Sequence, residues 1–114
     1  MKPFNLYDLM GATGGKVRAG NLEAALNRPL TGAETDSRKV QPGDLFLALK
    51  GPNSDGHAYV EAAFRNGAGA SLVSKEWAAE YLGDEPLLLV DDTEIGLGKI
   101  AGWHASRLPA RRVG

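Results

Sequence analysis

Two polar segments of the sequence carry side chains that are suited to holding an anion. The first is the pair Ser37 and Arg38, because a hydroxyl donates one hydrogen bond and a guanidinium can hold two oxygen atoms at once. The second is the segment 50–56 (KGPNSDG), whose glycines allow close backbone approach and whose Asn53 and Ser54 offer donors and acceptors. Together they indicate a site for a phosphate or another polar ligand.

Both segments also have a purely structural interpretation. Asp36 can satisfy backbone amides in a turn around Ser37, and segment 50–56 can be a tight connection between a strand and a helix. The position of segment 50–56 favours binding, since it follows an apolar run and precedes a helical pattern. Open α/β sheets bind ligands at that position, where the amino terminus of a helix offers unpaired N–H groups.

The other residues that could carry chemistry give weaker signals. Segment 14–16 (GGK) lacks the G-x-x-x-x-G-K-[ST] spacing of a phosphate loop, and His57 and His104 have no partner at the spacing of a metal site. No nucleophile with an adjacent base can be assembled, so we predict no catalytic residue and no metal site. Caps, turns and core packing explain the remaining candidates, which are Asp36, Asp55, Asp91, Asp92, Trp77 and Trp103.

The elements that must position these residues alternate between strands and helices. The apolar runs 44–49 and 86–90 are typical of interior strands that are covered on both faces, and 70–73 is a further short strand. Apolar stripes predict helices over 75–82 and over 93–107, and Tyr59, Val60, Ala63 and Phe64 form the stripe of another. This alternation predicts an α/β domain of three layers, with a small mixed sheet between helices.

Caps and turns mark the boundaries of these elements. Asn5 is expected to cap a first helix that ends at Gly14. Pro42 and Gly43 suit a type II turn in which Gly43 has a positive φ. Asp55 is expected to cap the helix after segment 50–56, and Thr93 the last helix.

Length and composition narrow the class of protein. We expect one domain over residues 1–114, because this length supports a single core. The formal net charge of -1 gives no footprint for nucleic acid, and no apolar run is long enough to cross a membrane. No cysteine is present, which fits a reducing compartment, so we expect a cytoplasmic protein.

Several motifs, taken in order, resemble the amino-terminal domain of the Mur ligases, in their MurE and MurF branches. These cytoplasmic ATP-dependent amide ligases build the peptide stem of peptidoglycan. The opening 6–9 (LYDL) and the ending 91–93 (DDT) look more like MurF, and MurE is the alternative. The shared motifs are 35–38 (TDSR), 42–51 (PGDLFLALKG), 55–60 (DGHAYV), 62–63 (AA) and 67–68 (GA).

The resemblance implies a role in substrate binding. In MurF the domain grips the UDP end of UDP-N-acetylmuramoyl-tripeptide, to which the enzyme joins D-alanyl-D-alanine. MurE adds the third residue of the stem. The positions that the resemblance assigns to UDP are Thr35, Ser37, Arg38, Pro52, Asn53, Ser54 and His57.

The resemblance also implies what the chain lacks. The family's ATP-binding loop and magnesium ligands belong to a central domain, which would begin near residue 112 and is absent from this sequence. ATP and Mg²⁺ are therefore expected for a full-length ligase and no cofactor for this fragment, which we expect to bind substrate without catalysing ligation. A free-standing α/β module that binds a protein through segment 50–56 is the alternative from another class, and a small hydrolase is a remote third.

Overall fold

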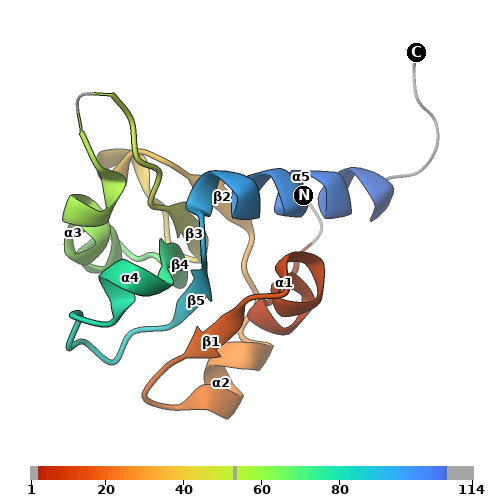
Figure 1. Cartoon of the computed structure of the whole chain (residues 1–114). Helices are drawn as coiled ribbons and strands as arrows, with labels where there is room; N and C mark the ends of the chain where they lie inside the picture. Colours follow the sequence, from red (N-terminus) through yellow and green to blue (C-terminus); the bar gives the residue numbers. More distant parts are fainter. Residues whose placement is uncertain (1–2, 53, 108–114) are drawn as a thin grey trace.

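The computed structural model describes residues 3–52 and 54–107, with side chains to residue 105 (Figure 1). Its sheet has five strands in the order β1-β5-β4-β3-β2. The strands are β1 (Lys16–Arg18), β2 (Gly32–Glu34), β3 (Asp44–Leu47), β4 (Ala70–Ser74) and β5 (Leu87–Val90). The helices are α1 (Leu6–Thr13), α2 (Leu22–Asn27), η1 (Ser37–Lys39), η2 (Gly56–Tyr59), α3 (Val60–Arg65), α4 (Lys75–Ala78) and α5 (Thr93–Arg107).

The sheet is mixed, as predicted. Strands β2 to β5 run parallel, and β1 pairs antiparallel with β5 at one edge. Both apolar runs become interior strands, since β3 lies between β2 and β4 and β5 lies between β4 and β1. Four parallel strands therefore end at one edge of the sheet.

The apolar runs are buried on both faces because successive side chains point to opposite sides of a strand. In β3, Leu45 and Leu47 belong to the core shared with α1, α2 and α5, whereas Phe46 belongs to the core shared with α3 and α4. In β4, Leu72 and Val73 divide in the same way. The predicted three-layer arrangement is therefore confirmed.

Local signals define most boundaries correctly. Asn5 and Asp8 form a reciprocal capping box at the start of α1, and Gly14 ends it with φ 74°. Gly43 has φ 89°, as a type II turn requires. The cap of α5 differs from the expectation, because Asp92 Oδ1 accepts the N–H groups of Glu94 and Ile95 while Thr93 is the first helical residue.

Helix α4 is shorter than the predicted 75–82, because past Ala78 the backbone hydrogen bonds change from the i→i−4 to the i→i−3 pattern. Past Ala78 the chain continues in tighter turns, in which Tyr81 N–H donates to Ala78 O. The guanidinium of Arg18 then donates to Ala78 O and to Tyr81 O, each at 2.8 Å. Nothing local in the sequence encodes that contact.

Helix α5 packs one side against the core. Leu97, Ile100 and Trp103 lie on that side, whereas Ile95, which was expected on the same stripe, is 60% exposed. Among residues 3–52 and 54–107, no helix has the length and apolar character needed to span a bilayer.

Two glycine substitutions are expected to change stability in opposite directions. Gly43→Ala should lower the free energy of unfolding by about 1–2 kcal/mol, because a side chain is strained at φ 89°. Gly98→Ala should raise it by roughly 0.5–1 kcal/mol, because Gly98 is exposed inside α5 with nothing within 4 Å of the added Cβ. Urea denaturation of both variants measures the difference, and equal effects would contradict this description of the turn.

Candidate functional site

The carboxyl edge of the parallel strands gathers the segments that the sequence singled out. Residues 35–38 follow β2, and segment 50–56 lies just beyond β3. The starts of α4 and α5 follow β4 and β5 at the same edge, which lies at the top of Figure 1. Polar residues that are far apart in the sequence therefore meet along one rim.

A hollow of about 680 Å³ opens beside the turn after β2, and we call it the first hollow. Its volume falls in the range of small-molecule sites, roughly 300–1,000 Å³. Three of the residues that the resemblance assigned to UDP lie here together. The lining residues are Thr35, Asp36, Ser37, Arg38, Tyr59 and Ala62.

Ser37 is the most constrained residue of the first hollow. Only 8% of it is exposed, and its hydroxyl has no hydrogen-bond partner among the residues that the structure describes. Its carbonyl oxygen accepts the side-chain amide of Asn66 at 2.7 Å, which ties the turn to the end of α3. The backbone at Ser37 is therefore tied to α3. Because no buried side-chain nitrogen or oxygen of the described residues lacks a partner, the unbonded hydroxyl of Ser37 is within reach of solvent.

Arg38 and Asp36 form a bidentate ion pair at the mouth of this hollow. Arg38 Nε and one terminal nitrogen donate to the two Asp36 oxygens at 3.1 and 2.9 Å, and Asp36 Oδ1 also accepts Arg38 N–H at 2.9 Å. These hydrogen bonds from Arg38 lower the pKa of Asp36 to about 2. The guanidinium side chain is 86% exposed, so it remains accessible to an anion.

Tyr59 is the residue of this hollow that the sequence analysis misplaced. The apolar stripe predicted Tyr59 in the core with Val60, but Tyr59 is 48% exposed and Val60 is fully buried. The difference arises because Tyr59 ends η2 while Val60 begins α3, so helical spacing does not apply across the junction.

A second hollow of about 580 Å³ lies over the ends of β4 and β5, and His57 lines it. Both nitrogens of the His57 ring are already used. Ser74 N–H donates to Nε2 at 3.0 Å, so the proton of the neutral ring is on Nδ1, which lies 2.6 Å from Asp55 Oδ1. Burial acts to raise the pKa of Asp55, but the hydrogen bonds from His57 outweigh it and lower that pKa.

The charge of the second hollow is opposite to what a diphosphate needs. One lysine, Lys50, faces six carboxylates there. No local spacing predicted this group, because it comes from the segment before η2, from α4 and from the start of α5. The acidic residues are Asp55, Glu76, Glu80, Asp91, Asp92 and Glu94.

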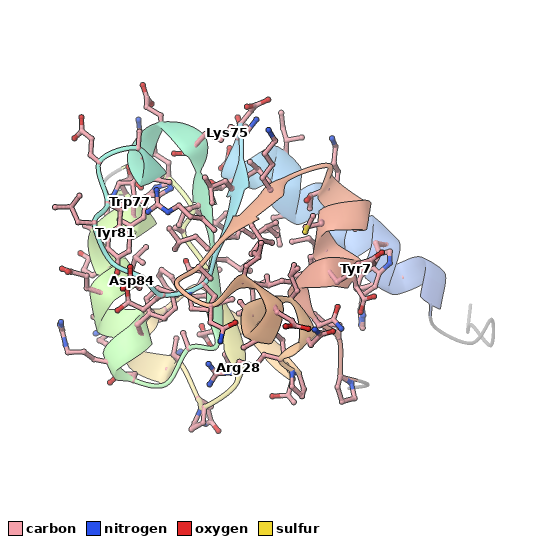
Figure 2. The ribbon with its side chains drawn as sticks, turned by 90° about the horizontal axis from the view of Figure 1, so that it is seen from below. Tyr7, Arg28, Lys75, Trp77, Tyr81 and Asp84 are labelled. Atoms are coloured by element: carbon pink, nitrogen blue, oxygen red, sulfur yellow. The ribbon has the colours of Figure 1, made fainter. Side chains whose placement is uncertain are left out.

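The aromatic residues beside the second hollow are packed together. The rings of Trp77 and Tyr81 stack with centroids 4.6 Å apart, and Figure 2 shows them side by side. The Trp77 ring also lies 5.4 Å from the His57 ring. This packing agrees with the structural role that the sequence predicted for Trp77.

The remaining predicted ligands lie on the segment that projects from the edge. Pro52 and Ser54 are exposed, and Asn53 lies outside the described residues. Gly51 N–H donates to Ser54 O at 2.7 Å and Gly56 N–H to Leu49 O at 2.8 Å, which closes the loop. The assignments of Pro52, Asn53, Ser54 and His57 to UDP stay predictions, as do those in the first hollow.

The fold and its polar rim define an α/β domain with open hollows at the carboxyl edge of a parallel sheet, among them the first and the second hollow. A sequence model described as "Mur ligase family, catalytic domain" matches residues 29–101. This chain belongs to the Mur ligase family, and it corresponds to the amino-terminal domain of these ligases.

Curated relatives support the same branches. The chain is 40% identical to the UDP-N-acetylmuramoyl-tripeptide--D-alanyl-D-alanine ligase of Escherichia coli K12, with 85% of this chain and 22% of that protein covered. It is 41% identical to the UDP-N-acetylmuramoyl-L-alanyl-D-glutamate--2,6-diaminopimelate ligase of Fusobacterium nucleatum, with 67% and 15% covered. The chain therefore spans about a fifth or less of the length of these proteins.

Solved structures confirm the fold. MurF from Acinetobacter baumannii superposes with a TM-score of 0.78 and 26% identity, over 94% of this chain and 22% of that one. MurF from Thermotoga maritima, solved in complex with ADP, matches 60% of this chain and 15% of its own, with a TM-score of 0.53 and 32% identity. The predicted resemblance to the MurF domain is therefore confirmed.

The ion pair in the first hollow is expected to control the titration of Asp36. Because its pKa is lowered in the folded state, the pair stabilises the fold above the ordinary pKa of aspartate, and this contribution is lost as the pH falls toward about 2. Arg38→Ala should move the midpoint of the Asp36 titration up toward the ordinary pKa of aspartate. NMR titration of the Asp36 carboxyl carbon measures it, with Arg65→Ala, another exposed arginine, as the control. An unchanged midpoint in Arg38→Ala would contradict the pairing.

The hydrogen bonds of His57 predict a mainly structural role. His57→Ala should lower the free energy of unfolding by about 2–3 kcal/mol, because it leaves the Ser74 N–H without its acceptor. Lys50→Ala changes an exposed residue of the same hollow and should change stability by less than about 0.5 kcal/mol. Thermal and urea denaturation compare the two, and a fully stable His57→Ala protein would favour a role in binding instead.

Proposed function

We propose that this chain is a substrate-binding domain of a peptidoglycan ligase of the MurF type. It holds the uridine diphosphate part of UDP-N-acetylmuramoyl-tripeptide while D-alanyl-D-alanine is joined to the peptide end. The observation that carries the proposal is the hydroxyl of Ser37, which lines the first hollow without a hydrogen-bond partner among the described residues, one residue before the accessible guanidinium of Arg38. A hydroxyl and a guanidinium together suit the oxygens of a diphosphate.

The position of this pair supports the proposal. The turn 35–38 follows a parallel strand at the carboxyl edge of the sheet, where open α/β folds bind their ligands. The second hollow has excess negative charge, so the first hollow is the better place for the diphosphate. Thr35 at its rim and Ser54 on the projecting loop can add hydrogen bonds to the nucleotide.

In a whole ligase the domain contributes by positioning. Binding energy from the nucleotide, which is remote from the reacting carboxyl group, orients the peptide end toward the reaction. This domain then supplies no reacting group. The fragment alone binds substrate and does not ligate, and its affinity is weaker than that of a full-length enzyme whose other domains share the substrate.

ATP and Mg²⁺ do not fit the residues present. The sequence holds no G-x-x-x-x-G-K-[ST] segment, and within residues 3–52 and 54–107 no group of three or more histidine, aspartate or glutamate side chains is arranged to hold a metal ion. We place both cofactors in a further, central domain that would begin near residue 112 in a cytoplasmic ligase. The same domain in a MurE-type enzyme is the second candidate, favoured by the identity to the 2,6-diaminopimelate ligases.

The proposal predicts that the isolated chain binds UDP through the first hollow. Titration with UDP, followed by amide NMR, should shift the signals of Thr35, Ser37 and Arg38. Ser37→Ala should weaken binding about tenfold, because a hydrogen bond to a charged group is lost. Ser71→Ala is the matched control, since it removes another buried hydroxyl, one bonded to Phe46 O, outside the first hollow.

Three other results would count against the proposal. Shifts confined to Lys50, His57 and Trp77 would move the ligand to the second hollow. Equal affinity in wild type and Ser37→Ala would remove the role of the hydroxyl. No shift with either UDP or a UDP-muramoyl peptide would favour the free-standing interaction module.

A further inference from the structure

We infer that the ring of Tyr59 is the surface on which the uracil base stacks when a uridine nucleotide occupies the first hollow. The inference rests on the proposed function and adds a residue, Tyr59, that would place the base at one wall of the first hollow and the phosphates at the other. It begins from the exposure of Tyr59. An aromatic side chain that is 48% exposed, next to the fully buried Val60, leaves apolar area in water that a ligand can cover.

The chemistry of the first hollow is divided between its walls. The turn 35–38 supplies hydroxyls and a guanidinium that is paired with the Asp36 carboxylate. Tyr59 and Ala62, at the junction of η2 and α3, supply an aromatic ring and a methyl group. A phosphate alone would use only the first wall. A nucleotide has both a charged part and a flat ring, so it matches both walls at once.

The two walls face the same space. The pKa of Arg38 is raised mainly by its hydrogen bond to Asp36, and to a smaller extent by Tyr59. The Asn66 side chain also ties the turn to the end of α3, the helix that begins directly after Tyr59. The backbone of the turn is therefore fixed relative to α3 before any ligand arrives.

The other aromatic residues near this edge are less suited to a base. Trp77 is stacked on Tyr81 and lies against His57, and it borders the acidic second hollow. Tyr7 is 67% exposed, but it lies on α1 and lines a different hollow. Figure 2 shows Tyr7 on the opposite side of the molecule from Trp77 and Tyr81.

The test compares two ligands that differ only in the base, UMP and ribose 5-phosphate. Tyr59→Leu should weaken UMP binding roughly tenfold or more, the loss expected for one stacked base, and leave ribose 5-phosphate binding unchanged. Tyr59→Phe should bind UMP as wild type does, because stacking needs the ring and not the hydroxyl. Tyr7→Leu is the matched control for removing an exposed tyrosine and should change neither affinity.

Ring-current shifts give a readout that does not depend on the stability of a variant. The uracil H5 and H6 signals should move upfield on binding to wild type and to Tyr59→Phe. If wild type binds UMP through Ser37 but these signals do not move, or if Tyr59→Leu binds UMP equally well, the inference is overturned while the proposed function stands. If wild type binds neither UMP nor UDP, both are overturned.

Discussion

The parallel pairing of β2, β3, β4 and β5 is the constraint on which the rest of this structure depends. Parallel strands need crossover connections, which cover the faces of the sheet, and so the interior strands β3 and β5 are almost wholly apolar. Since all four point the same way, every connection that leaves a strand starts at one edge. Residues separated by dozens of positions in the sequence are thereby brought to a common rim without any direct signal between them.

The first and the second hollow at that rim differ in charge. The first hollow presents an accessible guanidinium and an unpaired hydroxyl, and the second presents six carboxylates and one lysine. His57 stands between Asp55 and the backbone of Ser74, so it joins the segment before η2 to the end of β4. A formal net charge near zero therefore conceals an acidic second hollow beside a first hollow whose one cation and one carboxylate balance, a difference that overall composition does not reveal.

Signals that act over a few residues predicted most of the fold. The length and continuity of the apolar runs located β3 and β5. The caps at Asn5 and Asp55 and the turn at Gly43 follow from local backbone chemistry. The contact of Arg18 with the end of α4 was not predicted, because Arg18 is 60 residues from Ala78. Contacts of that range leave no pattern in a single sequence.

The site was predictable to the same extent. Thr35, Ser37 and Arg38 are neighbours in sequence, so their grouping follows from the turn, whereas Tyr59 joins them from another element through the packing of α3. Tyr59 was misplaced for a local reason. The apolar stripe assumed one helical pitch, whereas the chain changes from the 3-10 helix η2 to the α-helix α3 directly after Tyr59.

The outer strands of the sheet are its shortest. β1 and β2 have three residues each, and the Arg18 side chain reaches from β1 across to α4. An exposed edge strand is a template on which another chain can pair, and an apolar sheet is especially prone to such pairing. Short edge strands leave few unpaired N–H and C=O groups, which limits the length over which another chain could add to this sheet.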